Sequence, residues 1–222
     1  MADMKSGTNK VLIITGGRTE SELLKNLIDH EGYSMIIAAD HGLAAVDTLN
    51  ILPDYIVGDF DSVPEELLKK YRDASVPIET FPREKDKTDT QIAIELALAQ
   101  QAEEIHLIGA TGSRLDHTLA NIHLLLLPLH SGINACIIDS NNKIYLKQDN
   151  FSIHKRFQYG DYVSLLPFSE QVSDLTLKGF RYPLDGILLT AGSSLGISNE
   201  LLKETAEVEF SGGVLLVIES KD

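Results

Sequence analysis

The first part of the chain alternates short apolar runs with longer segments of helical periodicity. The apolar runs predict buried strands at residues 11–15, 34–40, 54–59, 76–81 and 104–109. Between them, apolar positions and capping pairs predict helices at residues 21–29, 43–49, 64–71, 88–101 and 115–127. Regular alternation of strand and helix is typical of a parallel sheet with helices on both faces. We therefore expect a Rossmann-like α/β domain.

After about residue 129 the helical periodicity stops. Short β-rich runs follow, from "NACIID" to "VLLVIES", separated by residues that favour turns. This pattern predicts a C-terminal all-β domain with a sandwich-like arrangement. We expect residues 1–148 to form the α/β domain and residues 149–222 to form the β-domain.

Composition excludes several classes of partner. The 222 residues carry a formal net charge of −14 and contain no basic block, so nucleic acid and anionic membranes are poor partners. Cys136 is the single cysteine, so no disulfide can form within the chain, and its apolar strand predicts a buried small side chain. The apolar run at residues 11–14 is too short for a signal or membrane segment. We expect a cytoplasmic protein.

Acidic side chains follow four successive predicted strands. They are Asp40 after the second strand, Asp59 and Asp61 after the third, Asp86 and Asp89 after the fourth, and Asp116 after the fifth. The carboxyl ends of parallel strands meet at one edge of the sheet, where ligands bind. Two unit charges ~4 Å apart cost ~4 kcal/mol at an effective dielectric of about 20, so this cluster needs a cation. Carboxylates without histidine or cysteine partners suit magnesium.

Phosphate fits the same edge. The loop "GATGSR" after the fifth strand offers backbone N–H groups at Gly112 and a guanidinium at Arg114. Along the extended stretch "GDFDS", alternation predicts that Asp59 and Asp61 point to one side and Phe60 points into the core.

Each of these residues also has a simpler interpretation. An aspartate in the first turn of a helix interacts favourably with the helix dipole, which alone would account for Asp89 or Asp116. A single glycine loop is a weak signal. His41 and His117 are more often surface histidines than ligands. The hypothesis of a metal–phosphate site depends on the motifs occurring together.

Five motifs in order resemble those of the bacterial type of thiamine pyrophosphokinase. They are "VGDFDS", "EKDKTDTQIAIELA", "LIGATGSRLDHTLANIHLL", "VSLLPF" with "LKGFRYPL", and "GISNE". The resemblance extends from about residue 36 to residue 218. It implies transfer of pyrophosphate from ATP to the hydroxyl of thiamine, giving thiamine diphosphate and AMP, with Mg²⁺. It also implies a homodimer with active sites between the subunits.

Site residues follow from the same resemblance. We expect catalytic roles for Asp59, Asp61, Asp86, Asp89 and Asp116, of which the first three hold Mg²⁺. The expected ATP contacts are Asp40, Ser62, Lys87, Thr88, Gly112 and Arg114. Through the "ISN" stretch, thiamine is expected to contact Ser198 and Asn199. If a general base exists, Asp89 or Asp116 could serve.

The chain departs from the family pattern in two places. Ser113 stands where a second glycine is common, and its N–H remains available. The chain has no tryptophan, whereas eukaryotic members stack one on thiamine, so another aromatic ring would have to replace it. Two alternative functions remain open: a pyrophosphokinase for another hydroxymethyl heterocycle such as a pterin, and a non-catalytic nucleotide sensor.

Overall fold

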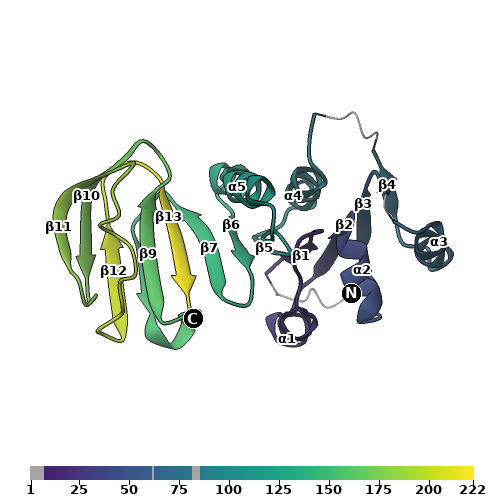
Figure 1. Ribbon diagram of the computed structural model, residues 1–222, viewed down its shortest axis with the longest axis horizontal. Helices are drawn as coiled ribbons and strands as arrows, with labels where there is room; N and C mark the ends of the chain where they lie inside the picture. Colours follow the sequence, from purple (N-terminus) through teal and green to yellow (C-terminus); the bar gives the residue numbers. More distant parts are fainter. Residues whose placement is uncertain (1–7, 62, 82–85) are drawn as a thin grey trace, which may run out of the picture. The chain divides into compact units, whose positions relative to one another are not determined.

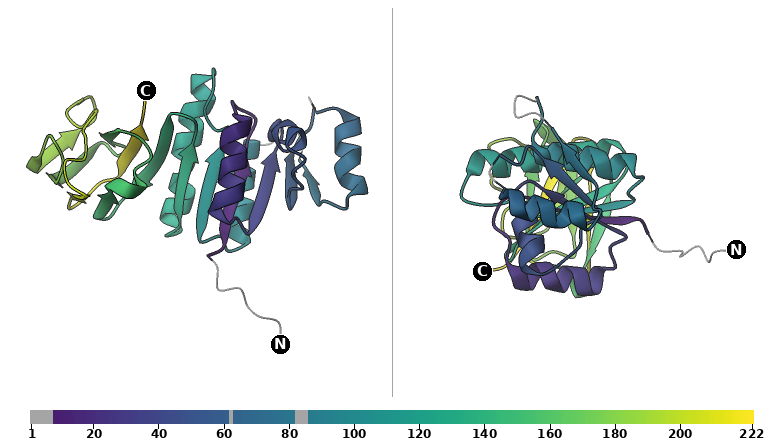
Figure 2. Two further views of the ribbon diagram at one scale, coloured as in Figure 1. Left: turned by 90° about the horizontal axis from the view of Figure 1, so that it is seen from below. Right: turned by 90° about the vertical axis from the view of Figure 1, so that its right-hand side faces the viewer.

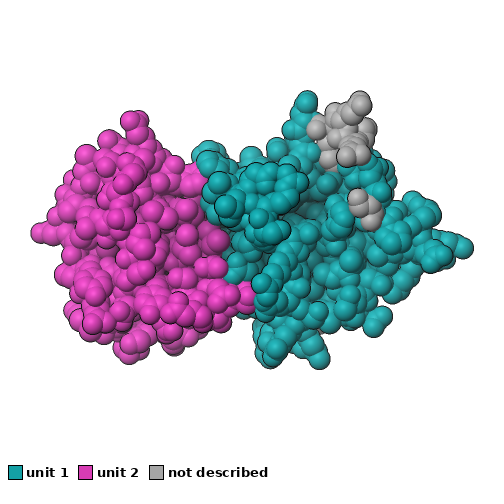
Figure 3. Space-filling model, in the orientation of Figure 1, with its two compact units in different colours: residues 1–139 teal, residues 140–222 magenta. Residues whose placement is uncertain are grey.

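The computed structural model describes residues 8–61, 63–81 and 86–222 and divides the chain into two compact units (Figure 3). Unit 1 is Met1–Asp139 and unit 2 is Ser140–Asp222. The division falls ahead of the predicted boundary at residue 148. The strand β7 (Asn142–Lys147) pairs along its whole length with β13 (Leu215–Ser220), and both belong to unit 2.

Unit 1 contains a parallel sheet in the order β4-β3-β2-β1-β5-β6. The strands are β1 (Lys10–Ile14), β2 (Met35–Ala39), β3 (Tyr55–Gly58), β4 (Ile78–Thr80), β5 (Glu104–Ile108) and β6 (Asn134–Ile138). The apolar runs at the centre of the sheet are buried on both faces, as in β1, where residues 11–14 have no exposed surface. The chain order reverses at the β1–β5 junction, which is where ligands bind in such sheets.

Helices cover both faces of this sheet (Figures 1 and 2). One face carries α1 (Ser21–Glu31), α2 (Gly42–Thr48) and α3 (Glu65–Asp73), whose buried side chains share a core with β1, β2 and β3. The other face carries α4 (Asp89–Ala99), α5 (Leu115–Leu124) and α6 (Leu126–His130). Among the described residues, no helix has the length and apolar character needed to span a bilayer.

One sequence prediction in unit 1 was wrong in detail. The single helix expected at residues 115–127 is divided into α5 and α6, because Pro128 has no N–H to donate to the carbonyl of Leu124. The run "NACIID" forms β6, which pairs in parallel with β5 and lies within the range expected for the α/β domain. The capping of α4 was predicted correctly: Thr88 Oγ1 accepts the N–H of Gln91 at 3.2 Å.

Unit 2 consists of two antiparallel arrangements of strands packed on one core. One contains β7, β13 and β9 (Tyr162–Pro167), with β13 in the middle. The other has the order β11-β10-β12-β8. Its strands are β8 (Phe151–His154), β10 (Gln171–Lys178), β11 (Leu184–Thr190) and β12 (Thr205–Glu209), and a short 3-10 helix, η1 (Lys155–Phe157), follows β8. Alternate residues point inward, such as Val163 and Leu165 of β9 and Val172 of β10. This is the predicted sandwich.

Candidate active site

A cavity of about 630 Å³ opens at the carboxyl end of the sheet in unit 1. It lies at the β1–β5 junction, between the loops that follow β1, β2 and β5 and the first turns of α4 and α5. The residues that line it are Thr15, Gly16, Gly17, Arg18, Ala39, Asp40, His41, Thr88, Asp89, Thr90, Gly109, Ala110, Thr111, Gly112, Ser113, Arg114, His117, Thr118 and Asn121.

Two glycine loops form the floor of this cavity. The N–H of Gly17 donates to Gly109 O at 2.7 Å, and the N–H of Arg18 donates to Thr111 O at 3.0 Å. This close approach requires glycine, because a Cβ on Gly17 would lie 2.2 Å from Gly109 O. The N–H groups of Gly112 and Ser113 have no hydrogen-bond partner within the described chain. They are therefore available to an anion such as phosphate.

Five residues expected at the site line this cavity. They are Asp40, Thr88, Asp89, Gly112 and Arg114. Lys87 is outside the lining, and its Nζ donates to Glu95 Oε2 at 2.8 Å, a bond that lowers the pKa of Glu95. Ser62 lies outside the described residues, so its predicted ATP contact stays a prediction.

Arg114 and Asp116 form an ion pair at the start of α5. Arg114 Nη2 lies 2.5 Å from Asp116 Oδ2, and Nε lies 3.2 Å from Oδ1. The hydrogen bond from Arg114 lowers the pKa of Asp116 to about 2. Both side chains are about two-thirds exposed. Because solvent screens an exposed ion pair, Arg114 can exchange Asp116 for an incoming phosphate at a small cost in free energy.

The acidic loop after β3 differs from its predicted conformation. β3 ends at Gly58, and Phe60 has a φ of 58°, so the stretch is not extended and the alternation argument fails there. Instead the N–H of Asp61 donates to Asp59 Oδ1 at 3.1 Å, which closes a tight turn. The burial of Phe60 was predicted correctly: it is 8% exposed and packs in the core.

The carboxylates proposed as metal ligands lie on two loops next to the cavity lining. Asp61 and Asp86 are exposed, and Asp59 is partly buried. No three His, Cys, Asp or Glu side chains within the described residues are grouped as a complete metal cage. Magnesium does not need such a cage, because it binds through one or two carboxylates together with water and substrate phosphates. Asp59, Asp61 and Asp86 supply the carboxylate oxygens that this mode uses, although the structure does not bring all three together as one group.

In unit 2, Ser198 and Asn199 lie in the loop before β12. Asn199 is 4% exposed, and its amide holds the backbone: Oδ1 accepts from Tyr182 N at 3.0 Å and Glu200 N at 2.9 Å, while Nδ2 donates to Tyr182 O at 2.8 Å. Ser198 is exposed and has a φ of 54°. The amide of Asn199 thus fixes the loop, and Ser198 is exposed beside it.

Sequence reasoning missed several residues that the fold places at these sites. The "TGGR" run after β1 lines the cavity, and a glycine pair directly after the first strand is a signal for a phosphate loop. Sequence reasoning also missed Asn121, whose Nδ2 donates to Ala110 O at 2.8 Å and so holds the loop after β5. In unit 2, Tyr182 is 57% exposed and joined to Asn199 by two hydrogen bonds.

Two family models match most of the chain. The model described as "Thiamin pyrophosphokinase, catalytic domain" matches residues 24–137, and the model described as "Thiamin pyrophosphokinase, vitamin B1 binding domain" matches residues 150–215. The chain is 36% identical over 203 residues to thiamine pyrophosphokinase of Bacillus subtilis (strain 168). The alignment covers 89% of this chain and 95% of that protein.

Solved structures are similar over nearly the whole chain. The crystal structure of thiamine pyrophosphokinase from Bacillus subtilis has a TM-score of 0.85 at 34% identity, covering 96% of this chain and 99% of that one. The thiamin pyrophosphokinase from Geobacillus thermodenitrificans has a TM-score of 0.83 at 35% identity, covering 96% and 98%.

Proposed function

The chain belongs to the thiamin pyrophosphokinase family, and from this premise we propose how its residues catalyse the reaction. It is an enzyme that transfers the β- and γ-phosphoryl groups of ATP, as one unit, to the primary hydroxyl of thiamine. The products are thiamine diphosphate and AMP. The absence of a membrane-spanning helix among the described residues and the lone buried cysteine are compatible with a cytoplasmic location.

One observation carries the assignment of the nucleotide site: the glycine-floored cavity lies at the point where the strand order reverses. The N–H groups of Gly112 and Ser113, which have no partner in the described part of the chain, suit phosphate oxygens. We expect Asp40, Lys87, Thr88 and Arg114 to complete the ATP site, together with Ser62. Arg114 would exchange its exposed partner Asp116 for phosphate.

Magnesium is the cation that the acidic loops fit, and Asp59, Asp61 and Asp86 would hold it. When bound, it neutralises phosphate charge and orients the triphosphate for attack at the β-phosphorus. The chain's own residues supply the remaining positioning: backbone N–H groups and Arg114 stabilise charge that develops on the transferred oxygens. If a base accepts the hydroxyl proton, Asp89 lines the cavity and Asp116 flanks it.

Thiamine would bind to unit 2 of the neighbouring subunit in a homodimer. The exposed hydroxyl of Ser198 can hydrogen-bond the pyrimidine, and Asn199 would act by holding the loop in place. Tyr182 supplies the ring that the absent tryptophan would provide, because it is exposed and tied to Asn199. Thiamine is cationic, and a net charge of −14 would attract it.

A product assay tests the proposal. The protein is incubated with ATP, Mg²⁺ and either thiamine or a hydroxymethyl pterin, and nucleotides and products are separated by chromatography. We expect AMP and thiamine diphosphate in equal amounts with thiamine and no AMP with the pterin. AMP formed only with the pterin would support the alternative substrate, and ATP binding without turnover would support a nucleotide sensor.

A further inference from the structure

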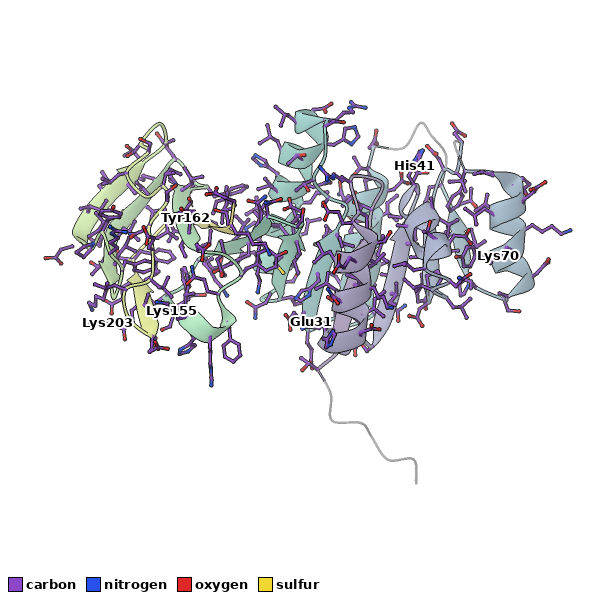
Figure 4. All side chains as sticks on the ribbon, turned by 60° about the horizontal axis from the view of Figure 1, so that its bottom comes forward. Glu31, His41, Lys70, Lys155, Tyr162 and Lys203 are labelled. Atoms are coloured by element: carbon purple, nitrogen blue, oxygen red, sulfur yellow. The ribbon has the colours of Figure 1, made fainter. Side chains whose placement is uncertain are left out.

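A histidine–aspartate pair occupies the end of β2, inside the cavity. His41 Nδ1 lies 2.5 Å from Asp40 Oδ2. A carboxylate can only accept, so Nδ1 carries the hydrogen and Nε2 is the ring nitrogen left for a ligand. His41 lines the cavity, and its side chain is 52% exposed. Figure 4 shows His41 and Glu31 at opposite ends of unit 1, with His41 at the end where the strands finish.

The backbone fixes this pair in place. Asp40 has a φ of 46°, an uncommon conformation for a residue with a side chain, and its N–H donates to Val57 O at 2.9 Å. The following Gly42 passes so close to β1 that a Cβ there would lie 2.1 Å from Ile14 O. A Cβ on Gly16 would likewise lie 2.9 Å from the Cβ of His41. The imidazole therefore lies directly beside the loop after β1.

The order of the strands places the loop after β2, which carries this pair, between two other loops of the site. The loop after β2 lies between the acidic loop after β3 and the glycine loops after β1 and β5. A triphosphate that reaches from a metal at Asp59 and Asp61 to the glycine loops must cross the loop after β2. A lone Asp40 carboxylate would repel it.

The carboxylate of Asp40 is held by His41. Oδ2 of Asp40 is occupied by the imidazole, and Oδ1 is buried and has no hydrogen-bond partner within the described chain. In the imidazolium form both ring nitrogens donate, so Nδ1–H can stay on Asp40 while Nε2–H is available to a phosphate oxygen.

We propose that His41 is a phosphate ligand of the bound nucleotide and that Asp40 is a positioning residue that orients it. The inference rests on the proposed function, since it assumes that the cavity takes MgATP. His41 donates Nε2–H to a phosphate oxygen, and the contribution of Asp40 to the phosphate part of the ATP site is to hold His41 in place.

The test compares His41→Ala, His41→Gln and His41→Lys with a control, His30→Ala. His30 is an exposed residue of α1, and its Nδ1 bonds only the carbonyl of Asn26 among the contacts described. KM and kcat are measured with MgATP and thiamine, and the affinities for MgATP and for adenosine are measured by calorimetry. A charge-assisted hydrogen bond predicts an increase of about 10- to 100-fold in KM and Kd for MgATP in His41→Ala.

Several outcomes separate the proposal from its rivals. His41→Lys should restore affinity, His41→Gln should restore little of it, and adenosine binding and the control should be unchanged. An equal loss of adenosine affinity, or MgATP affinity within twofold of the unmodified protein, would overturn the assignment. If the unmodified protein makes no thiamine diphosphate but MgATP affinity still falls in His41→Ala, the proposed function fails and the phosphate ligand is supported.

Discussion

Asp61 and Asp86 are exposed loop residues, outside the buried core. If they hold the metal, Asp61→Asn and Asp86→Asn should each lower kcat about 100-fold or more, because charge stabilisation of the transferred phosphoryl group is lost. The melting temperature without metal should stay the same or rise slightly, since one like charge is removed. Asp73→Asn, at the exposed end of α3, is the matched control. Near-normal turnover in both site variants would remove them from the metal site.

We predict that the side chain of Tyr182 contributes to the binding of thiamine and not to the binding of ATP. Tyr182→Ala should raise KM for thiamine about 3- to 30-fold, the range expected for loss of a ring over a cation, and leave KM for ATP unchanged. Tyr182→Trp should retain or lower KM for thiamine, because the larger ring keeps the contact. Steady-state kinetics with each substrate varied in turn measure this. Equal KM values for thiamine in Tyr182→Ala and the unmodified protein would contradict the stacking role.

Residues differ in how far the sequence could predict their surroundings. The acidic residues after the strands and the loop "GATGSR" were visible as motifs, and Asp40, Asp89 and Arg114 do line one cavity. The conformation of Asp59 to Asp61 was not predictable from alternation, because a left-handed Phe60 ends the strand early. The role of the Asn199 amide in holding the loop could not be predicted either, since the backbone groups of Tyr182 that it bonds are distant in sequence.

At the level of elements, local patterns predicted type and order well and tertiary contacts poorly. The alternating apolar runs gave the strands of unit 1, but β8 was missed because "FSIH" is short and half polar. Cys136 is buried as predicted, yet it is not only a small apolar side chain. Pairing of β5 with β6 places it opposite His106, and its interaction with the imidazole raises the pKa of that histidine.

The His106 cluster makes unit 1 sensitive to alkaline pH. Burial disfavours the charged ring, but hydrogen bonds with Cys136 and Glu104 outweigh it and raise the pKa of His106 to about 9. The other groups facing it are Tyr33, whose hydroxyl lies 2.7 Å from Nδ1, and Lys10 and Glu31 at the cluster's edge. A raised pKa stabilises the fold fully below about pH 6.5, the ordinary histidine value, and this contribution disappears as pH rises through 9.

We therefore expect the free energy of unfolding to fall by roughly 1–3 kcal/mol between pH 6.5 and 9.5. His106→Gln should be less stable at pH 6.5 and should show a flatter slope over this interval. Urea titrations at several pH values measure both, with His30→Gln, whose imidazole is exposed on α1, as the control. A slope in His106→Gln that equals that of the unmodified protein would rule out His106 as its source.

At the scale of the whole molecule, the division of labour between units predicts complementation. Asp61 is in unit 1 and Tyr182 is in unit 2, so a site shared between subunits takes one from each chain. When Asp61→Asn and Tyr182→Ala protomers exchange at random, half of the dimers are mixed and each mixed dimer has one intact site. Measured at thiamine concentrations well below KM, the activity of the mixture should exceed the average of the two parents by up to about a quarter of the unmodified level. Parental activity despite proven exchange would mean that each chain completes its own site.

The transfer of pyrophosphate as one unit is the central claim, and isotope position tests it most directly. The protein is given Mg²⁺, thiamine and ATP labelled with ³²P at either the α- or the γ-phosphorus, and the products are separated. We predict that the γ-label appears in thiamine diphosphate and that the α-label appears only in AMP. Recovery of the γ-label in thiamine monophosphate together with ADP, or of the α-label in any thiamine ester, would contradict the account.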